Sequence, residues 1–293
     1  MKWDFPAAKR HRVIVNTDAK NEADDQFAIV HALLTPAFEI HGVIPAHFGD
    51  HKSKTSQRDS HDETMLLLDL LDLDEPVTVA DGATQALPDE TTAVLSAGAE
   101  LIVREANRDD DRPLHVLFYG PLTDMAAALL MDPGITQRNV HVVWIGGGPW
   151  PVGGSEYNLS NDIHAANVVF KSALEVSQIP QSVYRQMTVG YAELYEQVHP
   201  CGRLGAYLVE QLVEYNARRP MAMEYRSLGD SPAVGVVLNP ACGVWEWRPA
   251  PEFAAGMNYL HTGANRPIRV YFSIDSRFIM EDMYAKLRAH TGN

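Results

Sequence analysis

The sequence predicts an α/β fold in which a mostly parallel central sheet is covered by helices on both faces. Two observations support this prediction. Short apolar runs rich in β-branched residues alternate with segments of helical periodicity along the 293 residues, and their connections are short. The runs are apolar at nearly every position, which is typical of strands buried on both faces.

Seven strands and seven helices are expected, in alternation. The strands are 13–16, 40–45, 77–80, 114–119, 140–145, 181–184 and 269–274. The helices are 24–34, 56–71, 91–107, 122–131, 163–172, 204–218 and 278–290. In the second helix, leucines recur at roughly helical spacing through residue 71, which predicts one apolar face.

Two stretches interrupt this alternation. Residues 146–161 are Gly-rich and polar, and residues 221–265 are rich in Pro and aromatic side chains without clear periodicity. Long irregular segments inside a compact domain are usually functional or disordered. Because strand patterns resume after both, we expect a single domain over residues 1–293, with an irregular aromatic-rich insertion around 221–265.

Composition limits the class of protein. The chain has 24 Lys and Arg against 38 Asp and Glu, a net charge of −14, so neither nucleic acid nor an anionic membrane is an expected partner. No apolar run reaches the roughly 18 residues of a membrane span, and the N-terminus lacks the apolar core of a signal peptide. Cys201 and Cys242 form no disulfide framework or CxxC zinc site. A cytoplasmic protein is expected.

Four carboxylates follow the first strand within eight residues: Asp18, Glu22, Asp24 and Asp25. In parallel sheets, ligands bind beyond the carboxyl ends of strands. Helix capping is the alternative explanation for Asp24 or Asp25, but it does not explain four acids together. Converging carboxylates repel unless a cation or a raised pKa resolves the conflict. The cluster therefore predicts a Ca²⁺ or Mg²⁺ site.

This segment resembles the N-terminal signature of the inosine–uridine-preferring nucleoside hydrolases, an Asp-Thr-Asp followed by Asp-Asp and an apolar helix. Five further blocks resemble that family in the same order. They are Asp81-Gly-Ala83, Tyr119-Gly-Pro-Leu-Thr-Asp124, Gly146-Gly-Gly148 with Glu156-Tyr-Asn158 and Asp162, Leu228-Gly-Asp230, and 269–277. The matches cover roughly residues 12–290. The resemblance implies a nucleoside hydrolase-like fold with a Rossmann-like core.

The resemblance also implies an activity, the Ca²⁺-dependent hydrolysis of the N-glycosidic bond of ribonucleosides or related ribosides, in purine or pyrimidine salvage. A metal-bound water would attack the sugar, with Asp18 as general base. The implied metal ligands, for Ca²⁺ or alternatively Mg²⁺, are Asp18, Asp25, the Thr123 backbone carbonyl and Asp230. Asp24, Glu156 and Asn158 would contact ribose hydroxyls. The implied assembly is a homodimer or homotetramer, and the partner a small riboside.

The chain departs from the family pattern at four places. Asp124 stands where the family's Gly-Pro-Leu-Thr-Asn block ends in Asn. The first Asp of the signature is Asn16, and the loop to the Asp pair is two residues longer, which leaves Asn21 and Glu22 as alternative metal ligands. Many members carry a His directly before the last metal-binding Asp, where it can protonate the departing base. Here that position is Gly229, and glycine has no proton to donate.

Other residues are candidates for the missing contacts. Replacements for the absent His are Tyr225, Arg226, Trp245, Glu246 and Trp247, with Trp150 in the Gly-rich loop, although buried aromatic residues more often belong to a core. His47 or Asp50 is the candidate for a further ribose contact, because both follow the second strand. No zinc-binding spacing accompanies these histidines.

Simpler explanations and other functions stay open. Capping also explains the side chains of Thr123, Asp124 and Asp230, and turn chemistry explains Glu156 and Asn158. One alternative function is a catalytically altered ribose- or nucleoside-binding protein on the same scaffold. Another is a different metal-dependent hydrolase, for example of phosphate esters. The sequence contains neither a GxSxG nucleophile turn nor a GxxxxGK[ST] phosphate loop.

Overall fold

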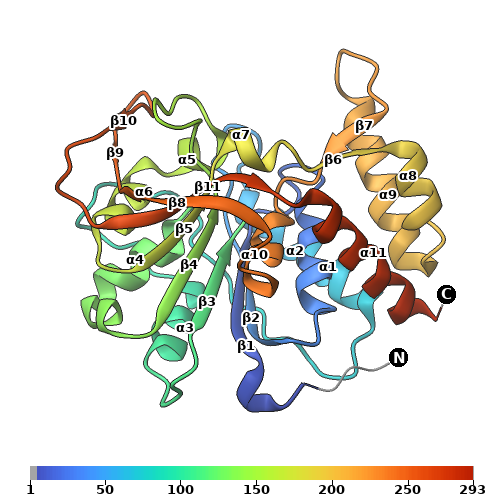
Figure 1. Cartoon of the computed structure of the whole chain (residues 1–293), viewed down its shortest axis with the longest axis horizontal. Coiled ribbons are helices and arrows are strands. Elements are labelled where there is room, and N and C mark those ends of the chain that lie inside the picture. The colour runs from blue at the N-terminus through green and yellow to red at the C-terminus, as the bar shows by residue number, and fades with distance from the viewer. Residues whose placement is uncertain (1–4, 293) are drawn as a thin grey trace.

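The central element of the protein is a seven-stranded sheet with the order β2-β1-β3-β4-β5-β11-β8, seen in a computed structural model that describes residues 5–292 (Figure 1). Six strands are parallel, and β8 pairs with β11 antiparallel at one edge. The predicted α/β fold with a mostly parallel sheet is confirmed. The sheet strands are β1 (His11–Thr17), β2 (Phe38–Pro45), β3 (Leu114–Phe118), β4 (Val140–Ile145), β5 (Glu175–Ile179), β8 (Gly243–Pro249) and β11 (Pro267–Ile274).

Helices connect and cover these strands. The α-helices are α1 (Asp25–Leu33), α2 (Ser56–Leu71), α3 (Ala97–Ala106), α4 (Thr123–Met131), α5 (Tyr157–Asn161), α6 (Ile163–Lys171), α7 (Gln181–Tyr184), α8 (Tyr191–Gln197), α9 (Gly202–Ala217), α10 (Pro232–Leu238) and α11 (Ser276–Thr291). Short 3₁₀ turns occur at Ala7–Lys9 and Pro133–Gln137. No helix in residues 5–292 is both long and apolar enough to cross a membrane.

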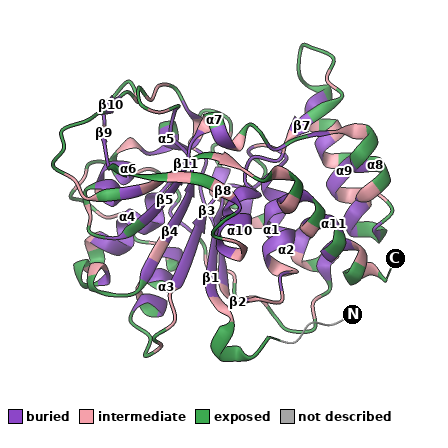
Figure 2. Ribbon diagram, viewed as in Figure 1, coloured by how far each residue is buried: buried purple, intermediate pink, exposed green. Residues whose placement is uncertain are grey.

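The sheet separates two apolar cores, which explains why its strands lack polar alternation (Figure 2). Val13 and Val15 of β1 point into the core shared with α1, α2, α9, α10 and α11, while Ile14 between them points into the core shared with α3, α4 and α6. In the same way Val143 and Trp144 of β4 contribute to opposite cores. The central strands β1, β3 and β4 are therefore buried on both faces, and polar residues gather at the strand ends.

Two of the predicted strands are wrong. Residues 181–184 form α7 instead of a strand, because Pro180 ends the extended run and stands at the N-cap of the helix. The neighbouring strand is β5, which ends at Ile179, directly before Pro180. Residues 77–80 run beside β2, but only Val79 forms a bridge, to Val43. This segment makes too few ladder contacts to count as a strand of the sheet.

Helix boundaries and the expected insertion also need correction. The helix predicted over 91–107 begins only at Ala97, where the Ser96 side chain accepts a hydrogen bond from the Ala99 amide as N-cap. The segment 221–265, expected to be irregular, contains α10, β8 and the short strands β7 (Tyr225–Ser227), β9 (Glu252–Phe253) and β10 (Tyr259–Leu260). β7 pairs with β6 (Thr188–Gly190). β8 was not predicted because five of its seven residues are exposed, so it lacks the continuous apolar run of a buried strand.

A buried polar link ties β1 to α4 beneath the strand ends. The Asn16 amide donates to Oδ2 of Asp124 at 2.9 Å, and both side chains are fully buried. The Ala83 amide and the Ser96 hydroxyl donate to Oδ1 of Asp124 at 2.9 and 2.6 Å. Asp124 thus joins four segments of the chain. It is not a simple helix cap, since its partners come from outside α4.

We predict that Asn16→Asp lowers the free energy of unfolding by about 3 kcal/mol, because it faces one buried carboxylate with another. The double variant Asn16→Asp/Asp124→Asn should recover most of this loss, since it restores one amide and one carboxylate in exchanged positions. Denaturant unfolding of the three proteins measures both effects. A double variant no more stable than Asn16→Asp would contradict the pairing.

Candidate active site

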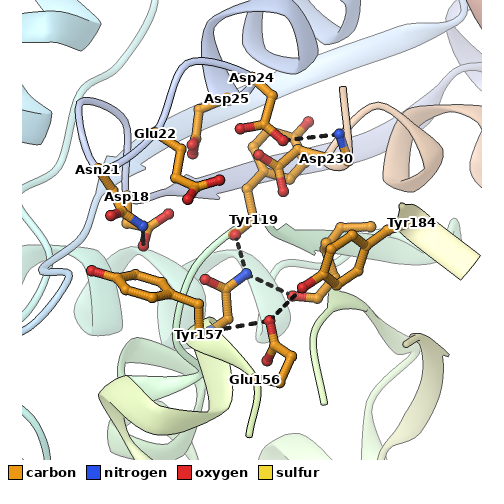
Figure 3. A pocket seen from close by; sticks show the side chains of 13 residues that line it. Asp18, Asn21, Glu22, Asp24, Asp25, Tyr119, Glu156, Tyr157, Tyr184 and Asp230 are labelled. Atoms are coloured by element: carbon orange, nitrogen blue, oxygen red, sulfur yellow. Dashed lines mark hydrogen bonds between the residues drawn. The ribbon is translucent and has the colours of Figure 1, made fainter. Parts of the chain in front are cut away.

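A small cavity of about 50 Å³ lies at the carboxyl ends of β1, β3 and β4 (Figure 3). Its lining comes from segments far apart in sequence: the β1–α1 loop, the ends of β3 and β4, the start of α5, α7, and the turn before α10. The lining residues are Asp18, Asn21, Glu22, Asp24, Asp25, Tyr119, Ile145, Glu156, Tyr157, Asn158, Tyr184, Gly229 and Asp230. Parallel strands bring their following loops to one edge, which explains this convergence.

Asp18 follows β1 directly and packs against the turn after β3. A Cβ added to Gly120 would lie 2.8 Å from Cγ of Asp18, so the turn needs glycine for this close approach. Asp18 is 1% exposed, and its Oδ2 accepts a hydrogen bond of 3.1 Å from the Asn21 amide. The loop residue Asn21 therefore fixes the orientation of the carboxylate that the sequence singled out as the base.

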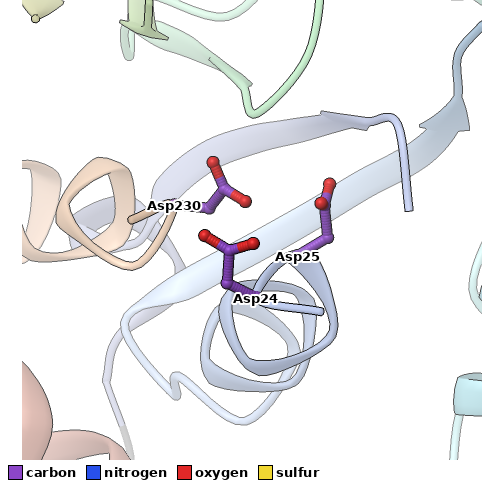
Figure 4. A group of neighbouring side chains, drawn as sticks. All are labelled: Asp24, Asp25 and Asp230. Carbon is purple, nitrogen blue, oxygen red and sulfur yellow. The ribbon is translucent and has the colours of Figure 1, made fainter. Parts of the chain in front are cut away.

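Asp24, Asp25 and Asp230 form a tight group, with one carboxylate oxygen of each within 4.8 Å of the others (Figure 4). Asp24 occupies the N-cap position of α1, yet its side chain makes no capping hydrogen bond. It accepts instead from the Gly229 amide at 2.9 Å, across 205 residues of sequence. Asp25 accepts from the Thr17 hydroxyl at 2.5 Å. Capping does not account for this arrangement.

Asp230 completes the group from the other side. Its side chain is 5% exposed and accepts no hydrogen bond from residues 5–292. A buried carboxylate without a donor is costly unless a proton or a cation compensates it. This orphaned acid, aimed at two others, is the feature of the site that most requires an ion.

The four aspartates all have raised pKa values. For Asp18 and Asp230 burial is the largest cause and moves the pKa well above its usual value, helped by the neighbouring carboxylates of Asp25 and Asp24 respectively. Burial, then Glu22, raises the pKa of Asp24 to about 6, although Arg226 opposes the shift. Burial, then Asp24, raises the pKa of Asp25 to about 7. Without a cation the cluster would hold protons near neutral pH.

This donor set fits a hard divalent cation. Ca²⁺ and Mg²⁺ take carboxylate oxygens, and a charge of +2 offsets the repulsion that raises these pKa values. The closest three carboxylates are those of Asp24, Asp25 and Asp230, so Asp24, expected at the ribose, lies among the candidate ligands. Asp18 lines the same cavity outside that group of three.

Neither alternative ligand in the longer loop is free to join the ion. The Asn21 Oδ1 accepts from Lys52 Nζ at 2.5 Å. Glu22 pairs through Oε2 with Arg226, and its Oε1 lies 3.5 Å from Nη2 of Arg219. Both side chains line the cavity, but their oxygens are engaged by cations of the protein.

Thr123 and His47 lie together behind the cavity lining. The Thr123 hydroxyl donates to Oδ2 of Asp162 at 2.8 Å, so it accepts from Nε2 of His47 at 2.9 Å. His47 Nδ1 then accepts from the Gly49 amide at 3.2 Å. Burial lowers the pKa of His47 to about 4, which agrees with this neutral tautomer. His47 orders the turn after β2. It is fully buried and does not line the cavity.

Glu156 and Asn158 line the cavity from the start of α5. Both oxygens of Glu156 are occupied: Oε1 accepts from the Asn158 amide and the Tyr184 hydroxyl, Oε2 from the Gly147 and Leu159 amides. Asn158 donates its side-chain amide to the carbonyls of Tyr119 and Ile145 at 2.6 and 2.8 Å. Its Oδ1 has no partner among the described residues, which leaves an acceptor for a hydroxyl in the cavity.

The aromatic candidates of the segment 221–265 lie elsewhere. Trp245 is on β8 at the far edge of the sheet, with the Arg269 guanidinium 4.7 Å from its ring centroid. Tyr225, Glu246 and Trp247 are absent from the cavity lining, as are Trp150 and Arg226. The aromatic lining residues are Tyr119, Tyr157 and Tyr184. Two of them had a signal in the sequence, since Tyr119 ends a strand and Tyr157 lies in the Glu-Tyr-Asn block.

Comparisons with known proteins agree on one family. The model described as "Inosine-uridine preferring nucleoside hydrolase" matches residues 13–276. A pyrimidine-specific ribonucleoside hydrolase, RihA, of Salmonella paratyphi A is 24% identical over 265 residues, 82% of this chain and 80% of that protein. Among solved structures, a purine-preferring ribonucleoside hydrolase from Gardnerella vaginalis has a TM-score of 0.78 at 20% identity, over 96% and 99% of the two chains. An inosine-uridine preferring nucleoside hydrolase from Bacillus anthracis has a TM-score of 0.72 at 18% identity, over 95% and 99%.

The carboxylate cluster predicts that Ca²⁺ affinity rises with pH. In the ion-free protein, the raised pKa values of Asp24 and Asp25 stabilise the fold at low pH, where both carboxyls are protonated. This contribution is lost as the pH rises through about 6 for Asp24 and about 7 for Asp25, because burial disfavours the charged forms. A cation binds the deprotonated cluster. Ca²⁺ should therefore raise the thermal unfolding midpoint more at about pH 8 than at about pH 5. Equal shifts at the two pH values, or equal shifts in wild type and Asp25→Asn, would argue against an ion held by these acids.

Proposed function

Since the chain belongs to the inosine-uridine preferring nucleoside hydrolase family and is a hydrolase of N-glycosyl compounds, we propose that it cleaves the N-glycosidic bond of ribonucleosides in a Ca²⁺-dependent reaction, with Asp18 as general base. The observation that carries the proposal is the group of buried carboxylates converging on one cavity, with Asp230 left without a donor. The proposed substrates are ribonucleosides with either type of base, because the similar proteins include pyrimidine-specific and purine-preferring enzymes.

The charge of the cavity suits the transition state of this reaction. Glycosidic cleavage develops oxocarbenium character on the sugar, which negative charge nearby stabilises. Asp18, Asp24, Asp25 and Asp230 provide that charge in a site shielded from water, where electrostatic effects are strong. When bound, a divalent cation would supply positive charge that orients the attacking water and lowers its pKa.

Asp18 is suited to accept the proton of the attacking water. Its Oδ2 is fixed by Asn21, so Oδ1 is left to face the cavity. Asn158 can accept a hydrogen bond from a ribose hydroxyl through its free Oδ1. Its side-chain amide donates to the carbonyls of Tyr119 and Ile145 at the ends of β3 and β4. Glu156 orders the turn that carries Asn158, and its own oxygens would have to exchange a partner to bind the sugar. Oligomeric state and single-domain organisation stay predictions.

Replacing Asp18 by Ala should lower turnover of a cleaved nucleoside by a factor of about 10² to 10⁴, the usual contribution of a general base. The measurement is release of reducing sugar from a panel of purine and pyrimidine ribonucleosides with Ca²⁺ present. Asp62→Asn is the control, because Asp62 is an exposed carboxylate paired with Arg58 on α2. Wild-type protein that binds ribonucleosides but cleaves none of them would instead support a binding protein.

A further inference from the structure

A second cavity adjoins the carboxylate site and is much larger, about 440 Å³ against about 50 Å³. The two share Asn21 and Glu22, so the longer β1–α1 loop forms the partition between them. A cavity of the first size is too small to hold a whole nucleoside. If the proposed function holds, the aglycone therefore extends past this partition into the second cavity, between the loop after β2 and the C-terminal half of α9.

Lys52 is the cation in this outer cavity that lacks a carboxylate partner. Of the three cations that line it, Lys20 pairs with Glu63 at 2.8 Å and Arg218 with Glu214 at 3.1 Å. Lys52 forms no ion pair with any carboxylate of residues 5–292; its Nζ contacts Oδ1 and the carbonyl of Asn21 at 2.5 and 3.3 Å. The same Nζ lies 4.2 Å from the ring centroid of Tyr157, a residue of the inner cavity.

One side chain connects this cation to the base. Asn21 accepts from Lys52 with Oδ1 and donates from Nδ2 to Asp18, at 3.1 Å. The amide therefore holds a carboxylate on the sugar side and an ammonium on the aglycone side of the same partition. Both groups are needed in hydrolysis of a glycosidic bond, where one accepts a proton from water and the other supplies one to the leaving group.

The position that could supply this proton in related sequences is Gly229 here. Its nearest replacement in the sequence, Arg226, is paired with Glu22, and a guanidinium keeps its proton at any ordinary pH. The aromatic candidates on β8 do not line either cavity. Lys52 is thus the group at the junction that has both a transferable proton and an unpaired charge.

We propose that Lys52 is the catalytic acid that protonates the departing aglycone. The C1′–N bond breaks with its electron pair moving to the aglycone nitrogen, which takes a proton from the Lys52 ammonium. Water forms the new C1′–O bond and gives a proton to Asp18. Asp18 then releases that proton to solvent and Lys52 takes one back, so the net reaction adds one water across the bond.

The surroundings of Lys52 adjust its acidity in a useful direction. The residue as a whole is exposed, but partial burial is the largest effect and lowers its pKa. The carboxylates of Glu22 and Asp18 oppose this shift, and the guanidinium groups of Arg219 and Arg226 reinforce it. A lysine with a lowered pKa loses its proton more readily than one in water. The carboxylates of Glu22 and Asp18 still favour the charged form of Lys52, so the ammonium is available to donate a proton.

The test compares two ribosides that differ in their need for a proton. Lys52→Met should lower kcat on a cleaved nucleoside, uridine or inosine, by about 100-fold or more. On p-nitrophenyl β-D-ribofuranoside, whose phenolate departs unprotonated, it should change kcat by less than about threefold. Lys52→Gln keeps a donor toward Asn21 and should show the same selective loss. Lys54→Met is the matched control, because Lys54 is exposed and pairs with Asp50.

The outcomes separate this inference from the proposed function. Equal losses on both ribosides mean that Lys52 acts only by holding Asn21 and Asp18, which overturns the acid role. Unchanged nucleoside cleavage in Lys52→Gln overturns it as well. A wild-type protein that cleaves neither riboside with Ca²⁺ present overturns the proposed function, and the acid role fails with it. Selective loss on the nucleoside in both variants, with Lys54→Met unaffected, supports the inference.

Discussion

Repulsion among buried carboxylates is the constraint on which the site depends. Asp18, Asp24, Asp25 and Asp230 are each at most 8% exposed, and they face a common space. Single donors stabilise three of them, from Asn21, the Gly229 amide and Thr17, yet their pKa values stay raised. Hydrogen bonds of this number do not replace the lost hydration of four charges. The two cores beneath the strand ends must therefore supply the stability that this edge of the sheet lacks.

The longer loop after β1 places cations on both sides of this acidic space. Glu22 pairs with Arg226, and Arg226 in turn offsets part of the rise in the pKa of Asp24. Asn21 connects Asp18 to Lys52. Asn21 and Glu22 of this loop thus contact one ammonium and one guanidinium from segments that the sequence alone does not bring together. The loop acts as part of the site's electrostatics rather than as a passive extension.

The fold and the acidic group were predictable because both follow from local patterns. Continuous apolar runs such as β4 identify buried strands, and the residues directly after strands identify the edge where Asp18 and Asp24 meet. What the sequence could not reveal depends on contacts between distant segments. The Gly229 amide on Asp24, the free Oδ1 of Asn158 and the Asn21–Lys52 contact have no local signature. β8 was missed because an exposed edge strand lacks the apolar run that marks a buried one.

Departures from a family pattern have to be interpreted in pairs. Asn16 stands where the pattern has Asp, and Asp124 stands where it has Asn; each change alone suggests a damaged site. The structure joins the two side chains in one hydrogen bond, so the chain keeps one carboxylate and one amide in exchanged places.

The glycine at position 229 is likewise explained by the residues around it. A Cβ there would lie 3.0 Å from the Tyr184 ring and 3.2 Å from Oδ2 of Asp24. The space of a missing side chain is thus already taken by Tyr184, whose hydroxyl holds Glu156. Restoring a histidine at 229 would displace that tyrosine rather than fill a vacancy, which is why the acid has to be sought on another wall of the cavity.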